Sequence, residues 1–194
     1  MKVVLIKYNA GNIQSVSFAL ERLGIDFSIT DDKEKIQSAD KVIFPGVGEA
    51  STTMEYLRNS KLDQVIRQLS QPVLGICLGM QLMCRYSEEN NTECLGIFDE
   101  PVKKFIPQGD MKVPHMGWNQ LHLTGGWISP ALDNQNAYFV HSYYVPVNEY
   151  TSAITEYINP FSAAMHRGNY YAVQFHPEKS AMAGELILKS FLEL

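Results

Sequence analysis

The sequence predicts an α/β fold with a central, mostly parallel sheet flanked by helices and an added region of antiparallel strands. In the first half, short apolar runs alternate with segments of helical apolar spacing, which is typical of parallel crossover units. In the second half, aromatic and β-branched residues predict further strands. No linker or internal repeat interrupts the 194 residues, so we expect one domain over 1–194.

Four short apolar segments in the first half predict buried strands, at 3–6, 26–30, 41–45 and 72–76. Helical spacing marks two segments between them, 13–23, which Gly24 ends, and 62–69. Further strands are predicted at 119–123, 136–145, 151–158 and 170–176, and a closing helix at 180–194.

Composition excludes several classes of function. The net charge of -5 has no strong block of either sign, so neither nucleic acid nor an anionic membrane is an expected partner. No apolar run approaches the ~18 residues of a membrane span, and the start lacks the features of a signal peptide. Cys77, Cys84 and Cys94 form neither an even set nor a CxxC pair, so we expect free thiols in a reducing cytoplasm. No metal-ligand spacing or phosphate-binding glycine loop is visible, and we expect no metal and no cofactor.

A cysteine between two glycines, in PVLGICLGMQL at 72–82, is the strongest chemical signal. Gly-x-Cys-x-Gly has the form of a nucleophile elbow, a sharp turn between a buried strand and a helix. Side chains at Gly75 or Gly79 would collide with the adjacent strand or helix. The turn would expose Cys77 at the carboxyl end of the sheet, beside a helix N-terminus that favours the thiolate. The alternative is that Cys77 is a small buried hydrophobe.

A cysteine nucleophile needs a base, and AVQFHPEKS at 172–180 offers one. His176 follows a predicted strand, and Pro177 bends the chain so that Glu178 could turn back to accept the Nδ1 proton. Nε2 would then face the cysteine. By itself, this segment would more often be a solvated surface loop, and the elbow is what favours the catalytic interpretation.

An oxyanion hole would complete the site. One donor is the backbone N–H of Leu78, immediately after the nucleophile. The segment FPGVGEA at 44–50 places Gly46 and Gly48 at the end of a predicted strand, where bare backbone can approach a substrate. An ordinary glycine turn is the alternative.

Three of these segments together resemble the triad-type (class I) glutamine amidotransferases: FPGVG at 44–48, GICLGMQL at 75–82 and QFHPEKS at 174–180. Within that family, the glutaminase subunits of imidazole glycerol phosphate synthases are similar in YNAGN at 8–12, PHMGWN at 114–119 and YFVHSY at 138–143. The resemblance spans nearly the whole chain. It implies a single-domain, flavodoxin-like amidotransferase fold.

The resemblance also implies a reaction. Cys77 would attack the side-chain amide of glutamine, His176 would transfer protons, and Glu178 would orient His176. The oxyanion would rest on the N–H of Leu78 and on a backbone donor near Val47. Water would then hydrolyse the thioester, releasing glutamate.

Substrate contacts implied by the resemblance are Gly46, Gly48, Gln81, Glu89, Ser142 and Tyr143. Gln81 and Glu89 would hold the zwitterionic end of glutamine. From the residues alone, Gln81 could instead be a solvated helix residue. Glu88 is also as well placed as Glu89.

Free ammonia would be lost to solvent, so such a glutaminase is expected to dock onto its consumer. In this family the partner is a (β/α)8-barrel cyclase that makes imidazole glycerol phosphate and an aminoimidazole carboxamide ribotide, in a heterodimer. The implied docking face contains Asn12, Met116, Trp118, Asn119 and Tyr138. A buried core aromatic explains Trp118 as well as an interface anchor does.

Three other functions compete with this prediction. The chain could be a glutaminase for a related synthase, such as a surface-sugar amidotransferase. It could be a non-catalytic module that regulates a synthase, although a complete triad argues against this. It could also be a cysteine peptidase or stress-type hydrolase on the same fold, which would lack the PHMGWN and HPEKS context.

Overall fold

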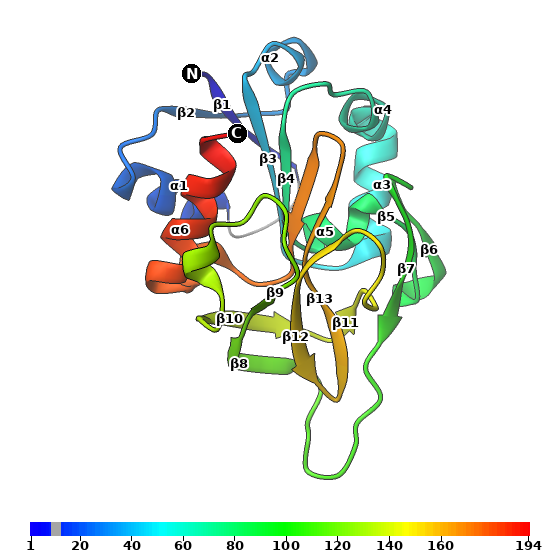
Figure 1. The fold of residues 1–194 in the computed structure, drawn as a ribbon. Coiled ribbons are helices and arrows are strands. Elements are labelled where there is room, and N and C mark those ends of the chain that lie inside the picture. Colours follow the sequence, from blue (N-terminus) through cyan, green and yellow to red (C-terminus); the bar gives the residue numbers. More distant parts are fainter. Residues whose placement is uncertain (9–12) are drawn as a thin grey trace.

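The chain folds around one large mixed sheet (Figure 1). The computed structural model describes residues 1–8 and 13–194. Eight described strands follow the order β2, β1, β3, β4, β14, β13, β12, β9 across this sheet. The first five pair in parallel, and the remaining pairings are antiparallel. Their bounds are β1 Val3–Ile6, β2 Phe27–Thr30, β3 Lys41–Gly46, β4 Val73–Cys77, β9 His122–Leu123, β12 Thr151–Tyr157, β13 Asn159–Arg167 and β14 Tyr170–Val173.

Helices cover both faces of this sheet, and each face buries its own apolar cluster. One face carries α1 and α6, whose inner residues include Leu20 and Ile187. The other face carries α2, α3, α4 and α5, with Met54 and Leu82 in its cluster. The helices are α1 Ile13–Arg22, α2 Lys33–Gln37, α3 Ala50–Ser60, α4 Leu62–Arg67, α5 Leu78–Met83 and α6 Ala181–Leu192.

Two smaller sheets lie beside the antiparallel part of the large one (Figure 1). One pairs β8 with β10, and the other follows the order β11, β7, β5, β6. Their strands are β5 Cys84–Ser87, β6 Thr92–Glu93, β7 Phe98–Lys104, β8 His115–Gln120, β10 Asn136–His141 and β11 Tyr143–Tyr144. Short 3-10 helices are η1 Glu89–Asn91, η2 Pro130–Leu132 and η3 Pro177–Lys179.

The predicted fold class is confirmed: a parallel centre, flanking helices and an antiparallel region. The expected strand at 3–6 is β1, and Gly24 ends α1 with a φ of 68°. The strand predicted at 170–176 ends earlier, at Val173. Helix α3 and strand β13 were not predicted. Among the described residues, no helix is both long enough and apolar enough to cross a membrane.

Candidate active site

Cys77 stands at the sharp turn that the sequence predicts. It is the last residue of β4, and α5 begins at the next residue. Its φ of 53° and ψ of -109° lie outside the regions that a side chain ordinarily adopts. Such strain is characteristic of a nucleophile elbow, in which the backbone forces the side chain out of the strand.

Glycines make the elbow possible because three backbone segments crowd together there. A Cβ at Gly79 would lie 2.1 Å from the carbonyl oxygen of Phe44, on the neighbouring strand β3. A Cβ at Gly75 would lie 3.0 Å from the carbonyl group of Gly79, and one at Gly46 would lie 2.5 Å from the Gly79 nitrogen. The collisions expected for side chains at Gly75 and Gly79 are therefore confirmed.

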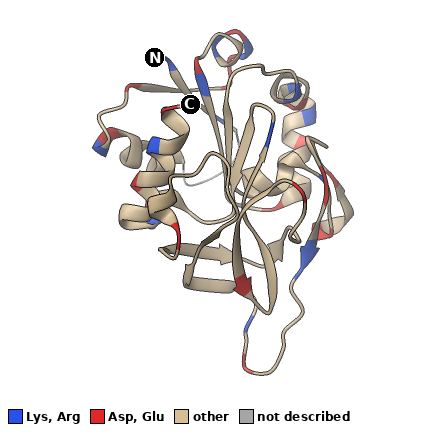
Figure 2. Cartoon of the chain, viewed as in Figure 1, with Lys and Arg blue, Asp and Glu red and all other residues tan. Residues whose placement is uncertain are grey.

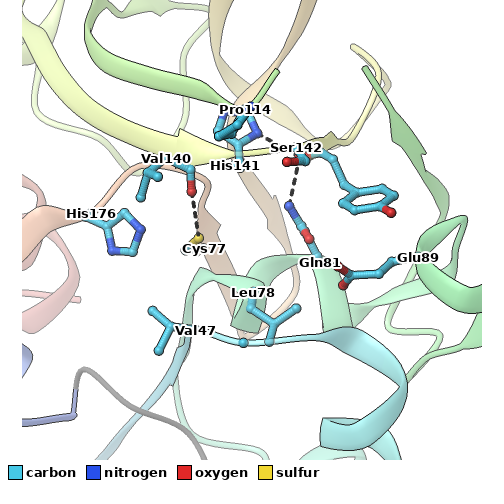
Figure 3. A pocket seen from close by; sticks show the side chains of 12 residues that line it. Val47, Cys77, Leu78, Gln81, Glu89, Pro114, Val140, His141, Ser142 and His176 are labelled. Carbon is cyan, nitrogen blue, oxygen red and sulfur yellow. Dashed lines mark hydrogen bonds between the residues drawn. The ribbon is translucent and has the colours of Figure 1, made fainter. Parts of the chain in front are cut away.

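His176 and Glu178 lie next to this elbow. Nδ1 of His176 is 2.7 Å from Oε1 of Glu178, and both side chains are buried. Because the carboxylate can only accept, Nδ1 carries the proton and Nε2 is left for the cavity. Figure 3 shows the imidazole of His176 pointing toward Cys77. The structure thus brings the three predicted triad residues together.

The pKa of His176 reports this environment. Burial opposes a charged imidazole, but interactions with Cys77 and Glu178 outweigh burial and raise the pKa of His176 to about 10. A protonated imidazole beside a thiol is the arrangement that activates a cysteine as a thiolate.

Several backbone contacts hold the His176 loop in place. The N–H of His176 donates to the carbonyl of Tyr138 at 2.9 Å. Ser180 Oγ donates to the His176 carbonyl at 2.7 Å and accepts from the N–H of Tyr138 at 2.9 Å. Helix α6 packs so closely that a Cβ at Gly184 would lie 1.8 Å from the carbonyl oxygen of Pro177. The loop that carries His176 and Glu178 therefore contacts both β10 and α6.

A buried glutamine that the sequence analysis missed also touches the nucleophile. Nε2 of Gln174 lies 3.7 Å from Sγ of Cys77, and Oε1 of Gln174 accepts from Nε2 of Gln81 at 2.9 Å. Its place two residues before His176, in an otherwise apolar segment, is the signal that could have identified it.

A cavity of about 310 Å³ opens in front of Cys77 (Figure 3). Its size is at the lower end of the range for small-molecule sites. Residues of the loops, of the elbow and of the two smaller sheets line this cavity. They are Val47, Gly48, Cys77, Leu78, Gln81, Glu89, Pro114, Val140, His141, Ser142, Tyr143 and His176.

Predicted substrate contacts fall into two groups. Gly48, Glu89, Ser142 and Tyr143 line the cavity. Gly46 instead lies behind the elbow, packed on α5.

Gln81 also lines the cavity, but its Nε2 donates to the carbonyl of Tyr143 at 2.9 Å and to Gln174 at 2.9 Å. Both amide hydrogens of Gln81 are therefore used within the protein.

Of the two neighbouring glutamates, the structure places Glu89 at the cavity. Glu89 faces the cavity and accepts from the N–H of Ala50 at 2.8 Å. Burial raises the pKa of Glu89, the hydrogen bond from Ala50 lowers it, and the charge of Glu49 raises it. Glu88 points elsewhere and accepts from the N–H of Lys104 at 2.7 Å.

The residues of the implied docking face lie on β8 and β10. Met116 and Trp118 are 64% and 55% exposed, so Trp118 is not a core aromatic. The ring of Tyr138 lies 5.9 Å from that of Trp118, centroid to centroid. Asn119 donates to the carbonyl of Glu156 at 2.9 Å. Asn12 lies outside the described residues.

Cys84 and Cys94 are buried free cysteines without a place in the cavity. Burial raises the pKa of both thiols, to about 12 for Cys94. Within the described ranges, no cluster of three or more His, Cys, Asp or Glu side chains is arranged to hold a metal ion.

A strained cysteine beside a histidine–glutamate pair, at the carboxyl end of a parallel sheet, is the arrangement typical of α/β enzymes that use a cysteine nucleophile. The family of class-I glutamine amidotransferases matches residues 4–194. The chain belongs to this family.

Relatives and solved structures agree with that assignment. The chain is 62% identical over 196 residues to the imidazole glycerol phosphate synthase subunit HisH of Bacteroides fragilis (strain YCH46), across the full length of both. It is 45% identical to the protein of the same name from Vibrio parahaemolyticus, covering 100% of this chain and 98% of the relative. A crystal structure of a glutamine amidotransferase superposes with a TM-score of 0.76 at 20% identity, covering 98% and 97% of the two chains. Another, from Thermotoga maritima, has a TM-score of 0.64 at 16% identity, covering 100% of this chain and 81% of that one.

Proposed function

We infer that this chain is the glutaminase subunit of an imidazole glycerol phosphate synthase, which releases ammonia from L-glutamine for histidine biosynthesis. The observation that carries this proposal is the close grouping of Cys77, His176 and Glu178 at one cavity, in a chain 62% identical over its full length to a relative of that name. That relative's name also favours this synthase over a surface-sugar pathway.

The residues fit a two-step acyl transfer. The Cys77 thiolate attacks the amide carbon of glutamine, and the proton on His176 passes to the departing nitrogen. Ammonia leaves and a thioester forms. His176 then takes a proton from water, the resulting hydroxide attacks the thioester, and glutamate leaves with the cysteine restored. Glu178 stays charged and holds His176 in the tautomer that serves both steps.

Charge develops on the amide oxygen in each step. The N–H of Leu78, at the start of α5, is one expected donor to that oxygen, and the N–H of Val47 is the other. Both residues line the cavity. Val47 follows β3 and Leu78 begins α5, and these two elements are in close contact. Gly48, beside Val47, has a φ of 120°, which suits a loop built from bare backbone.

The far end of the cavity would bind the zwitterionic end of glutamine. The carboxylate of Glu89 is the group suited to the α-ammonium. Backbone groups of Ser142 and Tyr143 would complete this contact, and Gln81 would hold Tyr143 in place through its amide. Gly46 would act indirectly, by letting the elbow approach β3.

The exposed face of β8 and β10 would dock the (β/α)8-barrel cyclase in a heterodimer. Neither strand contains a charged residue (Figure 2). Met116, Trp118 and Tyr138 supply apolar contacts on this face, whereas the side chain of Asn119 turns to the inner face and donates to the carbonyl of Glu156. Large exposed aromatics of this kind are the usual anchors of protein interfaces. Co-purification of the two subunits, and its loss in Trp118→Ala, tests this part of the proposal.

The decisive experiment on the reaction uses Cys77→Ala in complex with the cyclase. We expect ammonia release from glutamine to disappear while the circular dichroism spectrum and the complex survive. Cys94→Ala, which removes a buried thiol away from the cavity, is the matched control and retains activity. Full activity in Cys77→Ala would refute the proposed nucleophile.

A further inference from the structure

Two buried histidines that the triad does not use form a pair, and one of them, His141, lines the cavity. His115 on β8 and His141 on β10 stand directly opposite in the register of the two strands. Nδ1 of His115 lies 3.1 Å from Nε2 of His141, and the residues are only 3% and 6% exposed. Polar rings this deeply buried are costly unless each nitrogen has a partner.

The partners fix the direction of every hydrogen bond in this pair. Nδ1 of His141 lies 2.7 Å from the carbonyl oxygen of Tyr143, which can only accept, so Nδ1 carries the proton. Nε2 of a neutral His141 therefore accepts from Nδ1 of His115. Nε2 of His115 in turn accepts from Nδ2 of Asn119 at 3.4 Å.

Burial keeps both rings neutral, as this order requires. Burial lowers the pKa of His115 to about 4. It lowers the pKa of His141 to about 3, with the hydrogen bond to Tyr143 opposing and the charges of His115 and His176 assisting. At neutral pH each ring has one donor and one acceptor, and all four nitrogens are matched.

The two ends of this chain of hydrogen bonds lie in different parts of the protein. At one end, the carbonyl of Tyr143 accepts from both His141 and Gln81, so two donors hold it between β10 and α5. At the other end, Asn119 belongs to β8, whose opposite face exposes Met116 and Trp118. The histidine pair therefore connects the inner face of the two-stranded sheet to the backbone that lines the cavity.

We propose that His115 and His141 are positioning residues for glutamine binding, which hold the Ser142–Tyr143 backbone at the cavity through a directed chain of hydrogen bonds from β8. This proposal depends on the proposed function, because it takes that backbone to contact the substrate. Neither histidine is a proton-transfer group in the reaction. Their loss should weaken substrate binding more than it slows the chemical step.

The test measures glutaminase kinetics in the complex with the cyclase. His141→Phe keeps an aromatic ring among Phe105, Phe139 and Phe161 but removes the donor to Tyr143. We expect the KM for glutamine to rise about tenfold and kcat to fall less than about threefold. His141→Asn, which keeps an N–H donor near the position of Nδ1, should restore part of the loss. His122→Phe, at an exposed histidine on β9, is the control and leaves both constants unchanged.

A second pair of variants, at His115, tests the same proposal if His141→Phe does not fold. His115→Asn keeps a donor toward His141, whereas His115→Leu does not, so only His115→Leu should raise KM. An unchanged KM in His141→Phe and His115→Leu, with only a lower melting temperature, would overturn the proposal and leave the pair a packing feature. If the wild-type complex itself released no ammonia from glutamine, the proposed function would fail instead. Glutamine binding to the Cys77→Ala protein, compared with and without His115→Leu, would still test the positioning role.

Discussion

Two walls of the cavity are built by different means. The elbow wall, residues 44–48 and 75–79, is held by contacts between backbone atoms that leave no room for a Cβ at its inner glycines. The sheet wall, residues 115–120 and 136–144, of which 140–143 line the cavity, combines the strand pairing of β8 and β10 with side-chain hydrogen bonds among histidines, amides and carbonyls. Adding a Cβ where backbone atoms already touch forces the backbone to move, whereas removing one hydrogen bond costs only about 1 kcal/mol net. Cys77 thus stands on the elbow wall, whereas Ser142, Tyr143 and most of the proposed partner contacts lie on the sheet wall.

The largest effect is expected at Glu178, the carboxylate bound to His176 beside the cavity. Glu178→Gln keeps an oxygen near Nδ1 of His176 but removes the charge that favours the imidazolium. We expect kcat to fall about 10³-fold with KM nearly unchanged, in steady-state glutaminase assays of the complex. Glu185→Gln, at an exposed position on α6, is the control. A loss below tenfold would show that the carboxylate does not orient the base.

A side chain added in the elbow wall should lower the free energy of unfolding more than the loss of any single contact in the sheet wall does. Gly79→Ala places a Cβ 2.1 Å from the carbonyl oxygen of Phe44. We expect about 3 kcal/mol of destabilisation in urea unfolding. Gly24→Ala provides the comparison, because Gly24 has a φ of 68° but open space around it, and strain alone costs about 1 kcal/mol. Equal losses in the two variants would remove the steric argument.

The free energy of unfolding should depend on pH in opposite ways through the histidine pair of the sheet wall and through His176. The pKa values of His115 and His141 fall to about 4 and about 3 on folding, so the unfolded chain binds more protons below its own pKa of about 6.5. Their contribution is complete above pH 6.5 and is lost as pH falls toward 4, by about 2 kcal/mol per ring between pH 7 and pH 5. His176 has the opposite sign: its contribution is present below pH 6.5 and is lost as pH rises through about 10.

Urea unfolding at pH 7 and pH 5 measures this difference. His141→Phe should flatten the pH dependence, and His122→Phe should leave it as in the wild type. If both variants kept the wild-type slope, other groups would be responsible for the acid sensitivity.

The smallest effect is expected at the cap of α3, which borders the elbow wall. Glu49 accepts from the N–H groups of Ser51 and Thr52 at 2.9 and 3.0 Å. Burial opposes the charged form, but these hydrogen bonds lower its pKa to about 2, so the cap is kept down to acid pH. Glu49→Ala should cost about 1 kcal/mol in thermal unfolding. Glu55→Ala, exposed on the same helix, should cost much less.

The contrast between the walls also explains what could be predicted from the sequence. The elbow was predictable because Gly75, Cys77 and Gly79 are neighbours in the chain. The histidine pair was not, because His115 and His141 meet only through strand pairing 26 residues apart. Gln174 was missed for the same reason, since its partners Cys77 and Gln81 lie at the end of β4 and on α5, far away in the sequence.

Two missed elements have local causes. Helix α3 begins with ASTT, whose small and β-branched polar residues are weak helix signals, and its N-cap depends on Glu49. Strand β13 contains Pro160 and three small residues, so it lacks the alternation typical of a strand. Strand β13 is stabilised by pairing with β12 and β14 on either side, and this pairing cannot be recognised from its own sequence.

Helix α6 has a consequence for biosynthesis of the protein. The carbonyl of Pro177 touches Gly184 so closely that this helix forms the floor beneath the loop carrying the base. Cys77 is therefore translated well before helix α6 is complete. In a growing chain on the ribosome, the loop that carries His176 should lack this support until the last helix emerges and folds.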